Sequence, residues 1–347
     1  MGIGNRRGLR SFLAAMFSLF IIGAAVPALA DAITYTQRLL NNTNGVQGLA
    51  GISDVAVSAD GKFVYTASYS ASAISVFSRD LVTGQLTFSS VKTGISTAFS
   101  VATSPDNKSV YVASPSGYIF GFSRDEQTGA LTQISMVNSS PTSGFVSVSV
   151  SPNGKFVYGV GGSPSGLVVF SRNTTTGVIT AVADYADNVN GNYLGQGFGP
   201  TVSPIKNIVS SVDGQYLYVT STADNAVSLF SQNQTTGALT LQAVYIDGQS
   251  GFDGLQGASS VKMSPDGQHL YVTGQGESSI AILGVNGATG ALNYIDKVTQ
   301  GVNSITSLSG ARSLAISPDG RYVLASAITS NSVTAFSRNS TTGMLTF

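Results

Sequence analysis

The chain contains no cysteine, no tryptophan and a single histidine, and only 10% of its residues are charged. Without cysteine there can be no disulfide bond, no thiolate metal site, no cysteine nucleophile and no lipid-modified N-terminal cysteine. One histidine also excludes a cluster of histidine metal ligands. Stability must therefore come from a hydrophobic core, which 347 residues with 42% hydrophobic content can supply.

The first thirty residues have the order of a secretory signal. Three arginines precede an apolar run from Phe12 to Val26, and the small-residue sequence Ala28-Leu29-Ala30 follows. The apolar run is too short to be a good membrane span. We expect cleavage before Asp31, a single domain over residues 31–347 and a periplasmic or secreted protein.

Removal of residues 1–30 takes away three arginines and no acids. The mature chain then has 14 basic and 17 acidic residues, so that its net charge is about −3. Binding to nucleic acid or to an anionic membrane surface needs a clustered basic face. We therefore expect no nucleic-acid partner, and no membrane span after signal cleavage.

Two turns recur six times along the chain, and their spacing predicts the architecture. The first is an Asp-Gly type turn, found at Asp60-Gly61, Asp106-Asn107, Asn153-Gly154, Asp213-Gly214, Asp266-Gly267 and Asp319-Gly320. A Thr-Gly turn follows 22 or 23 residues later, at Gly84, Gly129, Gly177, Gly237, Gly290 and Gly343. A period of about 40 to 50 residues indicates one supersecondary unit that is copied along the chain.

Each repeat alternates apolar and polar residues with the period of two that is typical of strands. In the fourth repeat the predicted strands are 208–212, 216–220, 226–231 and 238–244. Repeated four-stranded units are the blades of a β-propeller, so we predict an all-β propeller with six repeats. The lack of tryptophan argues against a WD40 propeller.

Loop lengths differ between the two ends of the predicted blades. If the first strand of each repeat is innermost, both recurring turns lie on one face of the ring. The loops that join the second to the third strand and one blade to the next lie on the other face, here called the top face. The long top-face loops are predicted at residues 41–51, 184–204, 247–257 and 300–310.

Closure of the ring has two possible solutions. Ile33 to Leu39 has the register of a fourth strand, because Ile33 lies 27 residues before Asp60, as Leu239 does before Asp266. This segment could supply the fourth strand of the sixth repeat and displace residues 342–347, which closes a six-bladed ring. Alternatively, the chain is part of a larger or seven-bladed propeller.

The repeat consensus resembles the lactonase-like and YVTN-repeat β-propellers over essentially the whole mature chain. The residues that carry the resemblance are Ser264-Pro265-Asp266-Gly267 with Tyr271-Val272-Thr273, and Ser317-Pro318-Asp319-Gly320 with Phe336-Ser337-Arg338. The resemblance implies a fold shared with seven-bladed enzymes that open the ring of 6-phosphogluconolactone. The Gly-Pro-Arg-His stretch typical of those enzymes is Gly310-Ala311-Arg312-Ser313 here, which keeps the arginine and lacks the histidine. Exported YVTN-type propellers are similar to binding or surface proteins.

Lactone hydrolysis needs a base or metal that activates water, and a cation or hydrogen-bond donor for the oxyanion. We take Arg312 with Asp224 or Glu277 as the candidate catalytic groups. The single histidine, His269, is expected to be a solvated strand residue without a catalytic role.

Ligand contacts are expected on the top-face loops, from acids and aromatics that the turns do not use. These candidates are Asp184, Asp187, Tyr193, Phe198, Asp247 and Asp253. Asp247 and Asp253 lie in a Gly-rich loop and could bind Ca²⁺, although a polar loop without metal is the favoured interpretation. No other cofactor is expected. A binding or scaffolding propeller for a protein, glycan or small molecule is placed ahead of a periplasmic lactonase.

Overall fold

The computed structural model describes residues 37–138, 144–161, 166–186 and 205–347, and contains 24 strands in these ranges. The strands form six four-stranded sheets, and each sheet is an antiparallel meander in chain order. Among the described residues, no helix has the length and hydropathy that crossing a membrane requires. The predicted all-β class and the six repeats are confirmed.

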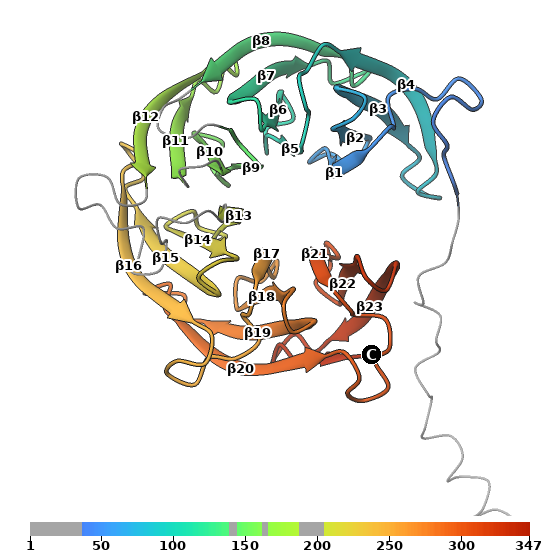
Figure 1. Cartoon of the computed structure of the whole chain (residues 1–347). Coiled ribbons are helices and arrows are strands. Elements are labelled where there is room, and N and C mark those ends of the chain that lie inside the picture. Colours follow the sequence, from blue (N-terminus) through green and yellow to red (C-terminus); the bar gives the residue numbers. More distant parts are fainter. Residues whose placement is uncertain (1–36, 139–143, 162–165, 187–204) are drawn as a thin grey trace, which may run out of the picture. The chain divides into compact units, whose positions relative to one another are not determined.

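The sheets are arranged as blades around a ring, and we number them one to six in chain order (Figure 1). The innermost strands are β1 (Ile52–Val57), β5 (Ser100–Thr103), β9 (Ser147–Val150), β13 (Ile205–Ser210), β17 (Ala258–Met263) and β21 (Ala311–Ile316). The second strands are β2 (Phe63–Ser68), β6 (Ser109–Ser114), β10 (Phe156–Gly161), β14 (Tyr216–Ser221), β18 (His269–Gly274) and β22 (Tyr322–Ala327).

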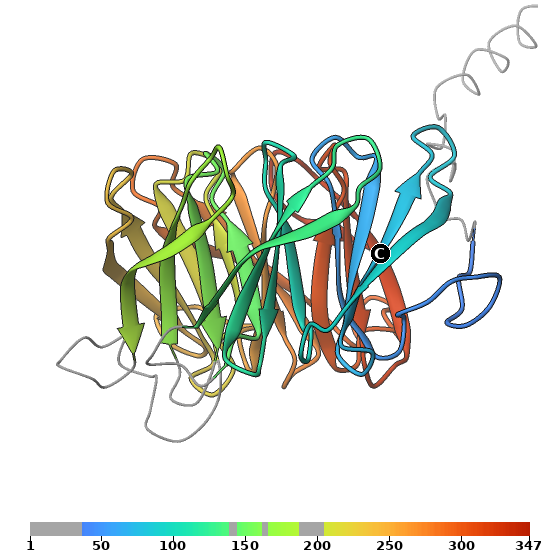
Figure 2. The same ribbon diagram turned by 90° about the horizontal axis from the view of Figure 1, so that it is seen from above.

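The two outer strands of each blade complete the sheets. The third strands are β3 (Ala73–Arg79), β7 (Tyr118–Arg124), β11 (Gly166–Arg172), β15 (Ala226–Gln232), β19 (Ser279–Val285) and β23 (Ser332–Arg338). The fourth strands are β4 (Leu86–Thr93), β8 (Leu131–Asn138), β12 (Ile179–Ala186), β16 (Leu239–Ile246), β20 (Leu292–Thr299) and β24 (Leu345–Thr346). Figure 2 shows these strands running between the two ends of the ring.

Each innermost strand packs against the innermost strand of the next blade, from β1 through β5, β9, β13 and β17 to β21. Within the described part of the chain, β21 does not pack against β1 in this way. The ring is therefore open between blade six and blade one, as Figure 1 shows.

The hydrophobic core lies between the blades. One cluster joins Tyr271 and Ile282 of blade five to Leu314, Val323 and Phe336 of blade six, and the other blade pairs have equivalent clusters. The second strands of blades one, two, three and five are buried along their whole length. A single blade cannot bury both of its faces, so each blade depends on its neighbours for stability.

The recurring turns form by local hydrogen bonding. The hydroxyl of Ser58 donates to the carboxylate of Asp60 over 2.5 Å, and the same carboxylate accepts the N–H of Lys62. In the Thr-Gly turns, the glycine has a positive φ, for example 72° at Gly129. A Cβ atom at Gly129 would also overlap the ring of Phe63 in the preceding blade. The glycine is thus needed both for the turn and for close packing between blades.

An arginine at the end of a third strand clasps the preceding blade. The guanidinium of Arg172 donates from Nε to the hydroxyl of Tyr111 over 2.8 Å, and it binds both carboxylate oxygens of Asp106 at 2.9 and 3.0 Å. Its side chain is completely buried. We call this arrangement, an arginine with the tyrosine and aspartate of the preceding blade, the blade clasp.

The clasp recurs between other blades with the same geometry. Arg124 of blade two binds Tyr65 and Asp60 of blade one, and Arg338 of blade six binds Tyr271 and Asp266 of blade five. Between blades three and four, Gln232 takes the place of the arginine and accepts from the hydroxyl of Tyr158 over 2.7 Å. Three of the aspartates predicted to be turn formers, Asp60, Asp106 and Asp266, are therefore also interblade ion-pair partners.

Blade six takes its fourth strand from the C-terminal residues Leu345–Thr346, contrary to the first solution for ring closure. β24 pairs with β23, with Ser337 opposite Thr346 and Arg338 opposite Leu345. The Thr-Gly turn at Gly343 returns the chain directly onto its own blade, so the local hairpin forms this edge. Residues 33–36 of the proposed strand lie outside the described residues.

His269 is buried, so the prediction of a solvated histidine was wrong. It is the first residue of β18 and lies beneath Gly343, where a Cβ atom would overlap its ring. Its Nδ1 accepts a hydrogen bond of 2.8 Å from Nη2 of Arg338, because a guanidinium can only donate. Burial and the positive charge of Arg338 lower the pKa of His269 below 6.5. Its role is in the clasp between blades five and six.

Three of the predicted long loops share one design. In each, a side chain at the start of the loop accepts the N–H of a leucine eight residues later: Asn41 binds Leu49, Asp247 binds Leu255, and Gln300 binds Leu308. The leucine then packs against its blade. The fourth loop was predicted to begin at Asp184, but β12 continues to Ala186 because its pairing with β11 extends through Asp184.

Replacing Arg172 with methionine tests the clasp. The substitution keeps most of the side-chain volume but leaves the Asp106 carboxylate and the Tyr111 hydroxyl without their partner. We expect a loss of about 3 kcal/mol or more in the free energy of unfolding, measured by denaturant titration. The control is Arg321→Met, whose exposed ion pair with Asp319 should contribute about 1 kcal/mol at most. Equal losses in the two variants would contradict a dominant role for the buried clasp.

The lowered pKa of His269 predicts a pH dependence of stability. The unfolded chain takes up this proton near pH 6.5 and the folded chain only at lower pH, so the stabilising effect is present above pH 6.5 and lost as pH falls. His269→Phe places here the residue type that Phe63 supplies in blade one, where Arg124 lies over its ring. We expect unfolding free energies that decline less between pH 7.5 and 5.5 in the variant, by about 1 kcal/mol. Parallel declines would contradict the assignment.

Candidate functional site

A ring of polar side chains occupies one register position of the innermost strands. Its members are Asp54, Ser100, Ser147, Asn207, Ser260 and Ser313, one from each blade. In blades two to six this residue is followed by an apolar residue that is buried between blades, such as Val101 or Val261, so the polar residue points to the other face of its strand. We call these six residues the polar belt.

Hydrogen bonds link the belt from blade to blade. The Oδ2 atom of Asp54 accepts from the Ser100 hydroxyl at 2.8 Å and from the Val101 N–H at 3.0 Å. Asn207 donates to the Ser147 hydroxyl and accepts the N–H of Val261. The belt therefore holds neighbouring inner strands in register.

Asp54 is the one carboxylate of the belt, and the sequence analysis did not single it out. It is partly buried, and its other oxygen accepts the N–H of Val55 at 2.9 Å. Its position in the sequence could have pointed to it, because no other first strand of the described blades contains an acid. An acid on an inner strand is not explained by turn formation.

Arg312 lies on β21, one position before Ser313 of the belt, and its side chain is exposed. Its main-chain oxygen accepts from the Ser259 hydroxyl of blade five at 3.1 Å. Within the described residues, its guanidinium has no hydrogen bond or ion pair. This cation is therefore available to an anionic or carbonyl group of a ligand.

The two acids proposed as partners of Arg312 bind elsewhere. Asp224, in the turn between β14 and β15, accepts from the Ser221 hydroxyl at 2.5 Å. Glu277, in the turn between β18 and β19, forms an ion pair of 2.7 Å with Lys297 and accepts the N–H of Gln256. No interaction in the described structure brings either carboxylate to Arg312.

Three carboxylates gather on the top face of blade five. Ligand atoms of Asp247, Asp253 and Glu277 lie within 4.8 Å of one another, which unites the two candidate Ca²⁺ ligands with a third acid. The ammonium of Lys297 lies 2.7 Å from both Asp253 and Glu277. The hydrogen bond from Lys297 lowers the pKa of Asp253. These acids, with Lys297, form what we call the acidic cluster.

The remaining predicted ligand residues fall in two groups. Asp184 is exposed on the outer strand β12, opposite Val168, and is not in a top-face loop as predicted. Asp187, Tyr193 and Phe198 lie outside the described residues.

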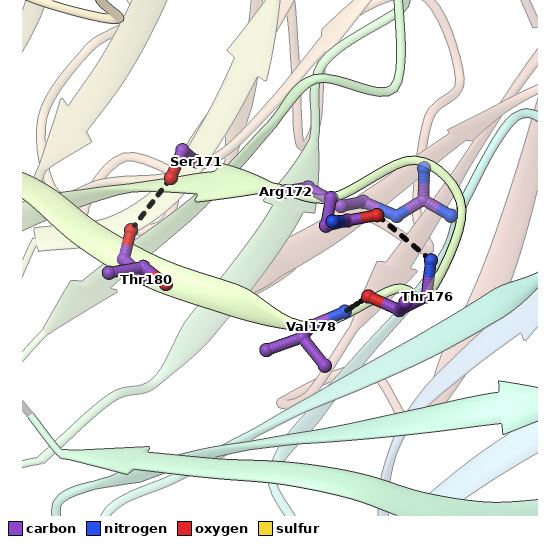
Figure 3. A pocket seen from close by; sticks show the side chains of 6 residues that line it. Ser171, Arg172, Thr176, Val178 and Thr180 are labelled. Carbon is purple, nitrogen blue, oxygen red and sulfur yellow. Dashed lines mark hydrogen bonds between the residues drawn. The ribbon is translucent and has the colours of Figure 1, made fainter.

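A hollow of about 530 Å³ lies at the turn between β11 and β12. Figure 3 shows that its lining side chains are engaged in turn structure: Ser171 donates to the main-chain oxygen of Thr180, and Thr176 accepts the N–H of Val178. The guanidinium of Arg172 belongs to the blade clasp. We therefore assign this hollow to the architecture of the blade.

Comparison with known proteins identifies a family. The family model described as "Lactonase, 7-bladed beta-propeller" matches residues 22–148 and 197–347. The 6-phosphogluconolactonase of Bacillus subtilis (strain 168) is 28% identical over 150 residues, which is 43% of this chain and 41% of that protein. In this match the chain thus spans about two fifths of the length of its curated relative.

Solved structures share the fold. A candidate 6-phosphogluconolactonase from Bacteroides uniformis ATCC 8492 is similar with a TM-score of 0.69 and 22% identity, over 86% of this chain and 84% of that one. The Pseudomonas aeruginosa periplasmic gluconolactonase gives 0.67 and 18%, over 84% and 83%. At these identities the likeness concerns the fold, whereas the family model matches the sequence over most of its length. The chain therefore belongs to the lactonase family of β-propellers.

Proposed function

We propose that this protein is a lactonase-type hydrolase, which opens a sugar lactone or a related cyclic ester. The observation that carries the proposal is the family match over residues 22–148 and 197–347. The match favours a lactonase over the binding or scaffolding module that the sequence had favoured. The named activity of the Bacillus relative supports the same substrate class.

The chemistry of lactone opening indicates which groups to assign. Water attacks the carbonyl carbon, negative charge develops on the carbonyl oxygen, and the ring oxygen leaves with a proton. We assign Arg312 to the developing negative charge, since its guanidinium is exposed and has no partner among the described residues. Arg312 is also the residue that the family resemblance singled out.

Asp54 is the candidate for handling the proton of the attacking water. It is the one acid of the polar belt, and hydrogen bonds from Ser100, Val101 and Val55 hold its carboxylate in place. A carboxylate positioned in this way can accept a proton from water without reorganising. Asp224 and Glu277 are less suited, because they lie in turns between second and third strands, whereas Asp54 lies on an innermost strand as Arg312 does.

We also propose that the protein acts outside the cytoplasm. The arginine-rich start, the apolar run and the Ala-Leu-Ala sequence of residues 28–30 support export. A structurally similar gluconolactonase is named as periplasmic. A substrate in that compartment would be a sugar lactone that reaches the cell envelope.

Lactonase activity can be measured on the purified protein with glucono-δ-lactone and 6-phosphogluconolactone, by titrating the acid released. We expect turnover above the buffer rate, and a fall of about 10²-fold in kcat/KM for Arg312→Ala. Arg79→Ala is the control, since that arginine lies on the third strand of blade one. Melting temperatures would verify folding. No turnover by the wild-type protein, or equal activity of Arg312→Ala, would contradict the proposal.

We propose further that Lys297 takes the place of a metal ion in the acidic cluster. Its ammonium lies within 2.7 Å of two of the three carboxylates and neutralises the charge that Ca²⁺ would otherwise balance. Burial alone would lower the pKa of Lys297, but the hydrogen bonds that its ammonium donates to Asp253 and Glu277 outweigh this effect and raise the pKa. Lys297 therefore stays protonated at neutral pH.

Lys297→Met tests this role. The substitution leaves three carboxylates within 4.8 Å without their cation. We expect a lower melting temperature without Ca²⁺, and recovery in millimolar Ca²⁺ because the ion binds only the folded form. The wild-type melting temperature should not respond to Ca²⁺. An equal response of wild type and variant would show that Lys297 does not replace the ion.

A further inference from the structure

Two aromatic side chains meet on the top face, where blade one packs against blade two. Tyr69 is the residue after β2 and Phe99 is the residue before β5, and their ring centroids lie 6.3 Å apart at an interplanar angle of 86°. Tyr69 is 47% exposed, Phe99 is partly buried, and the N–H of Tyr69 donates to the oxygen of Gly51 over 2.8 Å. We call these two rings the aromatic pair.

The repeat does not require aromatic residues at these two positions. In blades two, four, five and six, the position of Tyr69 is taken by Pro115, Thr222, Gln275 and Ile328. In the other five blades, the position of Phe99 is taken by Ser53, Val146, Lys206, Ser259 and Arg312. The blades therefore pack without aromatic rings here, and the pair is a departure from the repeat.

The aromatic pair is also separate from the core. Neither ring belongs to the hydrophobic cluster described between blades one and two. Completely buried tyrosines of the second strands have bonded hydroxyls, as Tyr65 does with the oxygen of Gly129. Within the described residues, the hydroxyl of Tyr69 has no hydrogen bond. An apolar ring and a free hydroxyl are therefore available to a ligand at this place.

Hydrogen bonds hold Phe99 beside the candidate acid Asp54. The hydroxyl of Ser53 donates over 3.1 Å to the oxygen of Ala98, the residue before Phe99. The hydroxyl of Ser100, the residue after Phe99, donates over 2.8 Å to the carboxylate of Asp54. Consecutive Cα atoms are about 3.8 Å apart, so the backbone of Phe99 lies next to a hydrogen-bond donor of Asp54. The aromatic pair is thus fixed relative to the carboxylate.

The aromatic pair also shares a level of the ring with Arg312. Phe99 holds in blade two the register position that Arg312 holds in blade six, directly before the belt residue. Figure 1 shows β5 and β21, the inner strands of these blades, facing each other across the centre of the ring. The candidate acid, the candidate cation and the aromatic pair therefore lie near the same ends of strands that surround this centre.

We propose that the aromatic pair binds the ring of the substrate lactone by stacking, and that it selects sugar lactones whose ring has an apolar C–H face. This inference rests on the proposed lactonase function. A pyranoid lactone has its hydroxyl and carbonyl groups at the rim and C–H groups on its faces, so one face can cover Tyr69 and leave water. The rim stays open to Asp54 and Arg312. Tyr69, the more exposed ring, provides the stacking surface, and Phe99 supports it.

The kinetics of Tyr69→Ala test this positioning role. We expect a rise of about tenfold in KM for glucono-δ-lactone with kcat changed by less than about twofold, because stacking stabilises substrate and transition state alike. Tyr69→Phe keeps the ring and should stay within about threefold of the wild-type KM. The matched control is Tyr118→Ala, which removes one ring of the Tyr118–Phe120 pair on the third strand β7 and should not change KM.

The absence of tryptophan allows a binding measurement that does not depend on turnover. Tyr69→Trp places a single tryptophan in the aromatic pair and keeps an aromatic surface there. We expect a saturable change in its emission on titration with D-gluconolactam, a ring analogue whose amide resists hydrolysis. Tyr118→Trp should not respond. Turnover absent in the wild type, together with a saturable response of Tyr69→Trp, would contradict the hydrolase and still support a sugar site at the aromatic pair.

Four results would overturn the proposal. The first is an unchanged KM of Tyr69→Ala in a protein that turns over the lactone, and the second is a loss confined to kcat. The third is an equal rise of KM in Tyr118→Ala, which would assign the effect to general loosening of the blades. The fourth is a Tyr69→Trp protein that is folded and does not respond to the lactam. Folding is verified by melting temperatures, which for substitutions of the half-exposed Tyr69 should stay within about 2 °C of the wild type.

Discussion

The contact between neighbouring blades is the interaction on which the rest of the structure depends. A blade of four short strands has two apolar faces and cannot bury either alone. The buried clasps of Arg124, Arg172 and Arg338 add charge-assisted hydrogen bonds at the edge of this apolar packing. Because a buried guanidinium is costly without a carboxylate, each clasp favours the blade packing that keeps its arginine and aspartate in contact.

The candidate site follows from the same packing. Interblade contacts bring the first strands side by side, and this places one polar residue from each strand in the belt. Asp54 and Arg312 stand on β1 and β21, the two inner strands that border the open side of the ring (Figure 1). The candidate chemistry thus lies beside the open side of the ring.

Much of the fold could be predicted from the residues. The six turn pairs and the period-two alternation predicted the six four-stranded blades. The loops that begin at Asn41, Asp247 and Gln300 were predicted to be long top-face loops, and they share one hydrogen-bonding pattern. The candidate site was harder to predict from the sequence. Asp54 could have been noticed as an isolated acid in a strand, but its hydrogen bonds to Ser100 and Val101 join residues 46 and 47 positions apart. His269 was misjudged because its burial depends on Arg338 and Gly343, about 70 positions away.

The sequence by itself determined the repeat, the strands and the turns, because Gly at positive φ, Asp or Asn at turn starts and alternating side chains act over a few residues. Only the tertiary structure decided which charges are paired between blades and where the ring is open. Those outcomes depend on contacts between segments 45 to 72 residues apart. No local pattern encodes the 54% exposure of Val55, since Val101 occupies the same strand position in the next blade and is buried by its neighbour.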